Sequence, residues 1–536
     1  MTKSLKLAAM TATLLAGVSM ALAAHAAIEK PVKTDAGLVS GTPGKVKGVT
    51  AFEGIPFGAP PVGDLRWKAP QPVAPWTGVR AGDKFGNVCM QPVGKGRLNL
   101  ATDLPDSPKM SEDCLYLNVW TPAAHAGQKL PVMVWLYGGA YSEGAGSMPF
   151  SDGDYLARKG VILVSFNYRV GALGFLAHPA LTAESPHNAS GNYALMDAIS
   201  ALQWVKANIA AFGGDPDNVT IFGQSAGACM NAALVGSPEA KGLFRRAISE
   251  SGAWMGLGIA KMTSLQEAEA QAVKTTDGLG LKTAADLRAM SAQDALTKLG
   301  RSGMIADGWI VPEDLSKTFA EGRQNKVDVL VGSNGAEGNF FGPAGAGMTA
   351  DKWRDGAGKR WGSLADKGMA AYPGATDEAA QAAAPKPFTD ALAWQMRLYA
   401  TDQAKIGNAA WVYHFTNSPP YPGGKPSLGA THASEIAYVF DNLAAPREIP
   451  DGSSPELASA DPRQVAFADQ VSSYWVNFAR TGNPNGAGLP KWPGVKALAP
   501  TETMLLDSTG SGAGPWLTKP QIDLYKATYD RDVGIH

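Results

Sequence analysis

The chain has 536 residues, and 47 Lys and Arg residues balance 48 Asp and Glu residues, which gives a formal net charge of -1 at pH 7. This balance supplies no basic surface for nucleic acid and no acidic tail, so it favours a neutral or small organic partner. The three cysteines Cys89, Cys114 and Cys229 are too few for a disulfide-stapled scaffold, and they lack the paired spacing of a zinc site. In an oxidising compartment they would give one bridge and one free thiol.

The N-terminus has the order of a secretory signal peptide. A positively charged start, Met1 to Lys6, is followed by a largely apolar run from Leu7 to Ala23 and by the small-residue site Ala24-His25-Ala26. The alternative is a membrane anchor, but Thr and Gly residues dilute the run and it is short for a bilayer-spanning helix. We predict a signal peptide at residues 1–26, cleavage after Ala26, a secreted or periplasmic product, and no later membrane span.

Hydrophobic patterning predicts alternating strands and helices after this segment. The runs at 130–136 and 161–166 are apolar without alternation, which is typical of strands buried on both faces. From Asn192 to Ala211 the apolar residues recur at steps of three and four, which predicts an amphipathic helix that ends at the glycines after it. Further strands are predicted, in chain order, at 219–222, 327–332 and 411–415.

These elements predict an α/β fold with a mostly parallel central sheet flanked by helices. Two stretches around 255–325 and 345–406 are rich in Ala, Leu, Gln and Lys, and we interpret them as large helical insertions. The sequence contains no fixed-period repeat, low-complexity tract or separating linker. We therefore expect residues 27–536 to form a single domain.

A G-x-S-x-G motif, Gly223-Gln224-Ser225-Ala226-Gly227, lies between the strand at 219–222 and a following helix. The bare motif would occur by chance roughly 0.4 times in such a chain, and the alternative is a glycine-rich turn with an N-capping serine. At a strand-to-helix turn, however, a serine sits on a strained bend, and flanking glycines let the backbone pass close to its neighbours. The helix after it also directs its positive end toward a developing oxyanion. This position predicts that Ser225 is a nucleophile.

The loop Tyr137-Gly138-Gly139-Ala140-Tyr141 leaves the strand at 130–136 upstream of this serine. A Gly-Gly pair alone is more often only a turn. Ester hydrolysis passes through a tetrahedral oxyanion, and small residues allow backbone N–H groups to approach it. The loop is therefore predicted to contribute to an oxyanion hole.

The chain resembles the type-B carboxylesterase and cholinesterase family of α/β-hydrolases over nearly all of the mature sequence. Four blocks carry this resemblance in the family's order, at 52–67, 112–122, 166–176 and 191–197. It implies an α/β-hydrolase fold and the hydrolysis of small-molecule carboxylic esters through an acyl-enzyme, with no cofactor and no metal. The sequence gives no indication of oligomeric state.

The resemblance also implies a Ser-Glu-His triad in that chain order. Glu337, in the loop 332–338, matches the family's acid, and His432, in the loop 429–436, matches its histidine. Chemistry agrees, because a serine hydroxyl needs a base and the base needs a carboxylate that fixes its tautomer. The competing acids are Glu435, which would brace the histidine loop, and Asp307. The competing histidines are His414, expected to pack inside a strand, together with His125, His178, His187 and His536.

Further site residues follow from the same resemblance. The N–H groups of Gly139, Ala140 and Ala226 are expected to form the oxyanion hole, and Cys89 is expected to pair with Cys114, which would stabilise the fold by about 3 kcal/mol. Cys229 remains as a packed thiol. The chain departs from the family at Gln224, a candidate substrate-binding residue, where glutamate is common. Without that negative charge, neutral esters are favoured over choline esters. The rival hypotheses are a lipase, thioesterase or amidase with the same triad, and a non-catalytic binding module.

Overall fold

A computed structural model describes residues 28, 30–92, 107–253, 255–257, 261–300, 303–340, 345–425, 427–446 and 453–534. The signal peptide predicted at 1–26 lies outside the described residues. In the described part of the chain, none of the helices combines the length and the apolar character needed to cross a bilayer.

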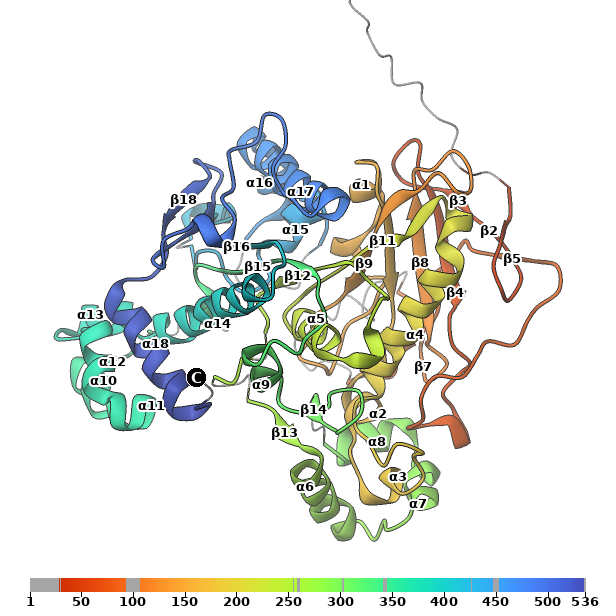
Figure 1. The fold of residues 1–536 in the computed structure, drawn as a ribbon, viewed down its shortest axis with the longest axis horizontal. Helices are drawn as coiled ribbons and strands as arrows, with labels where there is room; N and C mark the ends of the chain where they lie inside the picture. Colours follow the sequence, from red (N-terminus) through yellow and green to blue (C-terminus); the bar gives the residue numbers. More distant parts are fainter. Residues whose placement is uncertain are drawn as a thin grey trace, which may run out of the picture.

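An eleven-stranded mixed sheet runs through the centre of the molecule, in the order β18-β17-β16-β15-β12-β11-β9-β10-β8-β4-β3 (Figure 1). The strands from β10 to β17 are paired in parallel, and antiparallel pairs occur only toward the two edges. The mostly parallel sheet predicted from the sequence is therefore present. The strands are β3 (Thr42–Pro43), β4 (Thr50–Pro56), β8 (Tyr116–Thr121), β9 (Leu130–Leu136), β10 (Ile162–Phe166), β11 (Gly214–Gln224), β12 (Arg246–Glu250), β15 (Asp328–Asn334), β16 (Ala410–Phe415), β17 (Glu502–Leu506) and β18 (Gly512–Pro515).

Helices cover both faces of this sheet, which explains why its central strands are continuously apolar. On one face, α4 and α5 pack against β11, and α14 packs against β15 and β16. On the other face, α17 packs against β9 and β11, and α1 packs against β8 and β10. The bounds of these helices are α1 (Asp154–Ala157), α4 (Tyr193–Asn208), α5 (Ala226–Gly236), α14 (Lys386–Lys405) and α17 (Pro462–Thr481).

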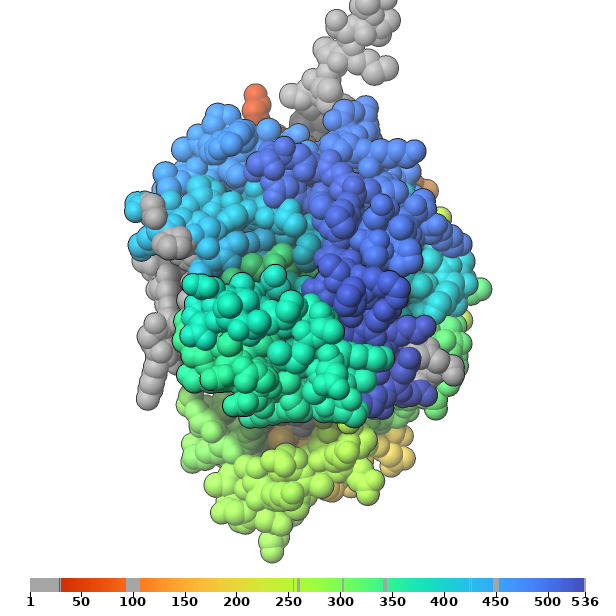
Figure 2. Space-filling model, turned by 90° about the vertical axis from the view of Figure 1, so that its left-hand side faces the viewer, coloured from red at the N-terminus to blue at the C-terminus, as the bar shows by residue number. Residues whose placement is uncertain are grey.

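The two stretches interpreted as insertions are largely helical. The first contains α6 (Leu265–Gly278), α7 (Ala284–Ala289), α8 (Ala292–Lys298) and α9 (Leu315–Ala320), and the second contains α10 (Ala350–Asp355), α11 (Ala357–Trp361), α12 (Ala365–Ala371) and α13 (Asp377–Ala383) before α14. The second group has its own apolar core, which includes Trp353 and Trp361 and which the C-terminal helix α18 (Lys519–Asp532) completes with Tyr525. Figure 2 shows these turquoise helices beside the dark-blue C-terminal segment.

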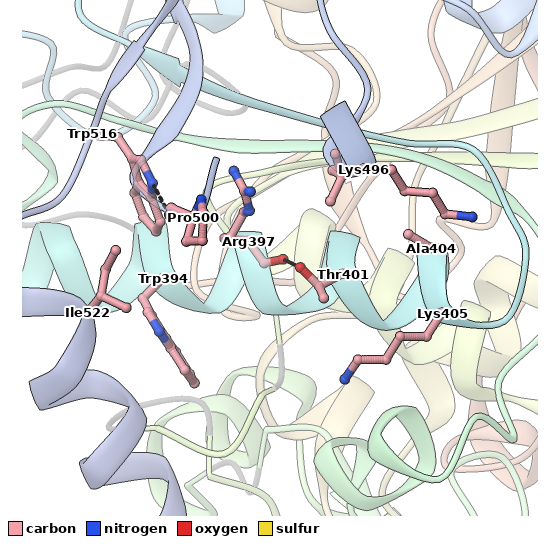
Figure 3. A pocket seen from close by; sticks show the side chains of 10 residues that line it. Trp394, Arg397, Thr401, Ala404, Lys405, Lys496, Pro500, Trp516 and Ile522 are labelled. Atoms are coloured by element: carbon pink, nitrogen blue, oxygen red, sulfur yellow. Dashed lines mark hydrogen bonds between the residues drawn. The ribbon is translucent and has the colours of Figure 1, made fainter. Parts of the chain in front are cut away.

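An open hollow of about 430 Å³ lies between α14 and the C-terminal segment (Figure 3). Its walls include Trp394, Trp516 and Ile522, so it is mainly apolar. The guanidinium of Arg397 donates to the backbone carbonyls of Leu498 and Ala499 and is not free to bind an anion. None of the site residues predicted from the sequence lines this hollow.

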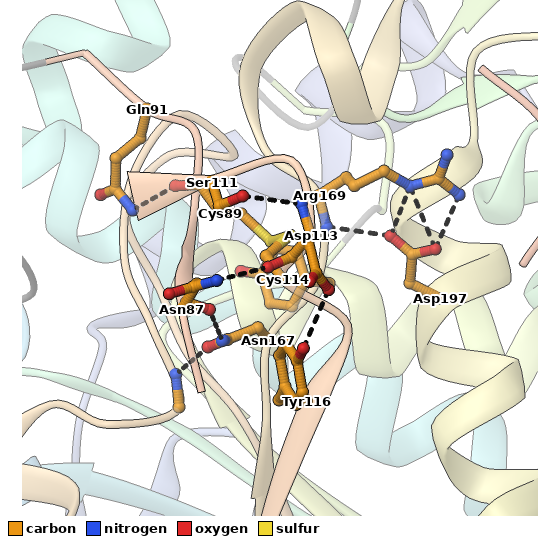
Figure 4. Close-up of a disulfide and its surroundings, with 12 residues drawn as sticks. Asn87, Cys89, Gln91, Ser111, Asp113, Cys114, Tyr116, Asn167, Arg169 and Asp197 are labelled. Atoms are coloured by element: carbon orange, nitrogen blue, oxygen red, sulfur yellow. Dashed lines mark hydrogen bonds and ion pairs between the residues drawn. A yellow bond between two sulfur atoms is a disulfide. The ribbon is translucent and has the colours of Figure 1, made fainter. Parts of the chain in front are cut away.

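The expected disulfide joins Cys89 to Cys114, and both side chains are buried. Figure 4 shows the polar contacts around it, in which Asn87 donates to the carbonyl of Asp113 and Asn167 donates to the carbonyl of Asn87. Two residues beyond the bridge, the side chain of Gln91 exchanges hydrogen bonds with the backbone of Gly144. The disulfide therefore lies beside the segment that follows the predicted oxyanion loop.

Replacing both Cys89 and Cys114 with alanine is expected to lower stability by about 3 kcal/mol, because the unfolded chain regains the entropy of a loop whose ends are 25 positions apart in the sequence. For a chain of this length that corresponds to a melting temperature lower by about 3 °C. Calorimetry of the variant checks this value, and a reductant should lower the melting temperature of the wild type but not of the variant. An unchanged melting temperature in the double variant would contradict the prediction.

Candidate active site

Ser225 lies on a strained turn between β11 and α5. Its φ of 55° and ψ of −121° place it in a region that non-glycine residues rarely adopt. The turn is held because the Ser225 N–H donates to the carbonyl of Glu250, at 2.8 Å, and the Ser225 carbonyl accepts from Cys229. The side chain is partly exposed at the carboxyl edge of the parallel strands, where α/β proteins place their ligand sites.

The two glycines of the motif are required by the close passage of β9. A Cβ atom on Gly223 would lie 2.5 Å from the carbonyl oxygen of Leu136, and one on Gly227 would lie 2.0 Å from the same oxygen. Any larger residue would push the turn away from β9. The backbone approach predicted for the G-x-S-x-G motif is therefore present.

The loop after β9 approaches Ser225 in the same way. A Cβ atom on Gly138 would lie 3.2 Å from the Cβ of Ser225, and Gly139 and Ala140 both have positive φ, of 114° and 51°. Within the described residues, the N–H groups of Gly139 and Ala140 donate to no backbone carbonyl. The N–H of Ala226 is at the first position of α5, where a helix leaves its N–H groups without an internal acceptor.

Two tyrosines fix the start of this loop. The Tyr137 hydroxyl donates to the carbonyl of Tyr168 at 2.9 Å, the Tyr168 hydroxyl donates to the carbonyl of Tyr137 at 2.6 Å, and the rings stack at 4.1 Å. Both side chains are buried. The reciprocal contacts hold the loop in one conformation, and such preorganisation is what an oxyanion site requires.

His432 and Glu337 lie in direct contact. The Nδ1 atom of His432 is 2.6 Å from Oε2 of Glu337, so the ring N–H donates to the carboxylate. The other carboxylate oxygen accepts from the Ser251 hydroxyl at 2.5 Å and from the Asn334 N–H at 2.8 Å. Glu337 is buried, whereas the imidazole is 17% exposed. The carboxylate is thus fully engaged and fixes the ring with Nε2 as the unprotonated nitrogen when the imidazole is neutral.

The pKa of His432 is raised above its ordinary value of 6.5, because burial lowers it but the charge and hydrogen bond of Glu337 outweigh burial, with a further contribution from Glu435. If His432 acts as a base, only its neutral form is competent. We therefore expect kcat/KM for a neutral ester to fall about tenfold per pH unit on the acid side, with a midpoint above 6.5. A rate profile from about pH 5 to about pH 9 checks this, and a midpoint below 6.5 would contradict the cause assigned here.

Gln224 and Cys229 flank the serine on the strand and helix sides. The Gln224 amide nitrogen is 3.2 Å from His432 Nε2, so this side chain reaches the imidazole and carries no charge. Burial raises the pKa of the Cys229 thiol to about 12, although a hydrogen bond with Tyr141 lowers it slightly. The thiol is therefore protonated at neutral pH and unsuited as a nucleophile.

The competing residues have other partners. His414 lies in β16, where burial lowers its pKa to about 4, and Glu435 accepts from the Asn334 side chain rather than from His432. Asp307 accepts from Asn192 and from the backbone of its own loop. The remaining described histidines also lie apart from Ser225: His125 contacts the carbonyl of Ala126, His178 caps α3 (Pro179–Thr182), and His187 stacks on Trp309. His536 lies outside the described residues.

Three residues of the site have no counterpart in the sequence-based prediction. Ser251 and Asn334 hold Glu337, and Glu250 accepts from the N–H of Ser225. Glu250 ends the short strand β12, Ser251 follows it directly, and Asn334 ends β15. A search of residues at the carboxyl ends of parallel strands would find all three, once β12 is recognised as a strand.

The chain is similar in sequence to known proteins over most of its length. A model of the carboxylesterase family matches residues 29–523. The fumonisin B1 esterase of Sphingopyxis macrogoltabida is 39% identical over 500 residues, which are 90% of this chain and 87% of the relative. The para-nitrobenzyl esterase of Bacillus subtilis is 36% identical over 492 residues, covering 87% of this chain and 94% of the relative.

Solved structures give the same result. A structure of para-nitrobenzyl esterase superposes with a TM-score of 0.77 at 32% identity and covers 93% of this chain and 99% of its own. The carboxylesterase of Geobacillus stearothermophilus at pH 6.2 has a TM-score of 0.76 at 31% identity, with 92% of this chain and 99% of its own covered.

Proposed function

This chain belongs to the carboxylesterase family, with its α/β-hydrolase fold, and we propose that it hydrolyses small-molecule carboxylic esters through an acyl-enzyme formed on Ser225. The single observation that carries the proposal is the 2.6 Å contact between His432 and Glu337 at the edge of the sheet that also carries the strained Ser225 turn. A serine nucleophile, a base and an orienting carboxylate are the groups that acyl transfer needs.

In the proposed first step, His432 Nε2 accepts the proton of Ser225 as the serine oxygen attacks the ester carbonyl. Glu337 stabilises the imidazolium that forms, because its carboxylate already accepts from Nδ1. The alcohol then leaves with the proton from Nε2. In the second step, water loses a proton to His432, attacks the acyl-enzyme and releases the acid.

The oxyanion of both steps is assigned to the N–H groups of Gly139, Ala140 and Ala226. Support comes from the free N–H groups of the loop, from its contact with Ser225 and from the tyrosine pair that holds it. Each such donor is worth roughly 2.7 to 4 kcal/mol in the transition state. An N–H group that is already fixed needs no rearrangement at the moment of reaction.

For the substrate we propose neutral esters rather than choline esters, because Gln224 places an uncharged amide beside the imidazole. The two bacterial relatives are named for small organic substrates, fumonisin B1 and para-nitrobenzyl esters. Hydrolysis of p-nitrophenyl butyrate, of a p-nitrobenzyl ester and of fumonisin B1 by the purified chain tests the class. Failure on every ester together with turnover of an amide or a thioester would replace the proposal with one of its rivals.

Gln224→Glu is expected to shift this preference. A carboxylate beside Nε2 would attract a cationic alcohol group, so the KM for acetylthiocholine should fall about threefold to tenfold relative to that of a neutral ester of equal size. The same charge should raise the pKa of His432 and move the acid limb to higher pH. The KM ratio measured for wild type, Gln224→Glu and the uncharged control Gln224→Ala checks this; a ratio that also changes in the alanine variant would contradict it.

We also propose that the chain is exported and cleaved after Ala26. The charged start, apolar run and small-residue site support this, and the Cys89–Cys114 bridge is compatible with an oxidising compartment. The intact mass of protein recovered from the periplasm or the medium should correspond to a chain that begins at Ala27. A mass that retains residues 1–26 would overturn the cleavage.

A further inference from the structure

Behind the proposed triad, a row of aligned residues crosses the sheet. Glu250 at the end of β12 pairs with Gly332 of β15, which pairs with Tyr413 of β16, so their side-chain positions point to the same face. Gly332 has no side chain, and the Tyr413 ring occupies the space, since a Cβ atom on Gly332 would lie 2.3 Å from that ring. The Tyr413 ring therefore leans across β15 toward Glu250.

Two buried glutamates, Glu250 and Glu435, lie close enough here for Glu435 to act electrostatically on Glu250. Glu250 and Glu435 are both fully buried. The indole of Trp475 donates to Glu250 at 2.7 Å, whereas Glu435 accepts from the Asn334 amide at 2.5 Å and from its own backbone N–H. The other oxygen of each carboxyl group has no partner among the described residues, and the same is true of the Tyr413 hydroxyl. Asn334 links the cluster to the triad, because its backbone N–H donates to Glu337.

The charges of this cluster do not balance if every acid is ionised. Glu435 repels Glu250 and Glu337 repels Glu435, and His432 is the one basic group that acts on Glu435. Among the described ion pairs, no lysine or arginine reaches Glu250 or Glu435. A buried carboxylate without a counter-charge is strongly disfavoured, so one of the two must hold a proton.

We propose that Glu250 and Glu435 act as one buried acid pair that holds a single proton on Glu250, and that the charge left on Glu435 supports the imidazolium of His432. Both are positioning residues, because neither touches the reacting atoms. This inference rests on the proposed function of His432 and adds a second negative group to the one supplied by Glu337.

The pKa directions of the groups that face the pair agree with this arrangement. Burial raises the pKa of Glu250 well above its ordinary value, and repulsion by Glu435 adds to the effect, although the Trp475 hydrogen bond opposes it. Burial and then Glu337 raise the pKa of Glu435 to about 7, whereas Asn334 and His432 lower it. Burial and the three glutamates raise the pKa of Tyr413 well above its ordinary value, so this hydroxyl stays neutral. Above about pH 7, Glu250 is thus protonated and Glu435 carries the charge.

The test compares the two amide variants. Glu435→Gln keeps an acceptor for Asn334 but removes the charge, so the acid midpoint of kcat/KM should fall by about 0.5 to 1 pH unit and the plateau by roughly threefold to tenfold. Glu250→Gln replaces a protonated acid by a neutral donor, so Glu435 stays ionised and the midpoint should remain at or above that of the wild type. Infrared spectra near pH 8 should contain the carbonyl stretch of a protonated carboxylic acid in the wild type, and this band should be absent from Glu250→Gln.

The matched control is Asp390→Asn in α14. This half-buried acid, whose pKa is raised to about 6 mainly by desolvation, accepts hydrogen bonds from Tyr372 and Gln521 and lies outside the cluster. Its substitution should leave the acid midpoint unchanged. An unmoved midpoint in a folded Glu435→Gln, or equal downward shifts in both amide variants, would overturn the proposal. If Glu435→Gln does not fold, retention of the infrared band in Glu250→Gln would overturn it instead.

The proposed function and this inference are tested by different experiments. Loss of ester turnover in Ser225→Ala tests the nucleophile, whatever the acid pair does. Conversely, if ester turnover is lost in Ser225→Ala while the acid midpoint of kcat/KM is the same in Glu435→Gln as in the wild type, the result would support the proposed function and overturn only the acid pair.

Discussion

Ser225→Ala is expected to lower kcat for a neutral ester by about 10⁵- to 10⁶-fold, the largest effect of any substitution considered. In the proposed mechanism this hydroxyl forms the covalent intermediate, and the nearby Cys229 thiol cannot replace it, because burial keeps that thiol protonated. Alanine keeps the Cβ atom and thus the backbone conformation of the turn, so the melting temperature should change little. Steady-state rates and labelling by a fluorophosphonate probe measure the effect.

Ser237→Ala is the matched control for this substitution. Ser237 follows the last residue of the same helix, is buried, and has no hydrogen-bond partner for its hydroxyl among the described residues. The control should be labelled at the wild-type rate. Labelling of Ser225→Ala at that rate would show that the probe reacts elsewhere and would remove the nucleophile from the proposal.

The sequence alone was sufficient to predict the strands that are continuously apolar. Strands β9, β10, β15 and β16 lie within two residues of their predicted bounds, because a strand covered on both faces has no polar alternation to obscure it. Strand β11 starts at Gly214 rather than at 219, since an irregularity between Gly214 and Val219 interrupts its pairing with β9. The polar residues of that irregular segment resemble a loop in the sequence.

Strand β12 was not predicted, and the reason bears on the site. Only Ala247 and Ile248 at its centre are apolar, and Arg246 and Glu250 at its ends are charged although both are buried. Charged residues usually lie at the surface, so hydrophobic patterning cannot find a strand that buries them. Because Ser251 follows this strand directly, its hydroxyl, which donates to Glu337, was not predicted either.

The residues of the candidate site differ in how well their roles can be predicted from the sequence. Ser225 and the candidate oxyanion loop were predicted from local patterns, namely a G-x-S-x-G motif at a strand-to-helix turn and a small-residue loop after a buried strand. His432 and Glu337 are 95 residues apart and needed the family resemblance, since no local pattern links them. Their contact depends on how β15 and the loop after β16 meet at one edge of the sheet, which is a property of the whole fold.

Glu337→Gln is the second substitution with a large expected effect, a fall in kcat of about 10⁴-fold. The Glu337 carboxylate accepts from three donors, namely Ser251 and Asn334 at one oxygen and His432 at the other. An amide has only one acceptor oxygen. If that oxygen keeps the first two donors, its NH₂ group faces Nδ1 and forces the tautomer in which Nε2 carries the proton and cannot act as a base.

In the opposite orientation the amide NH₂ group would face the Asn334 N–H, so two donors would meet without an acceptor. That orientation is therefore unfavourable as well. Glu435→Gln separates this effect from a general loss of negative charge, because it should cost only about threefold to tenfold. Glu337→Asp keeps the charge with a shorter reach and should lie between the two. The role of Glu337 would be contradicted if Glu337→Gln kept a kcat within tenfold of the wild type and an unchanged melting temperature. Glu435 would then be the candidate acid, because Asn334 donates to both Glu337 and Glu435.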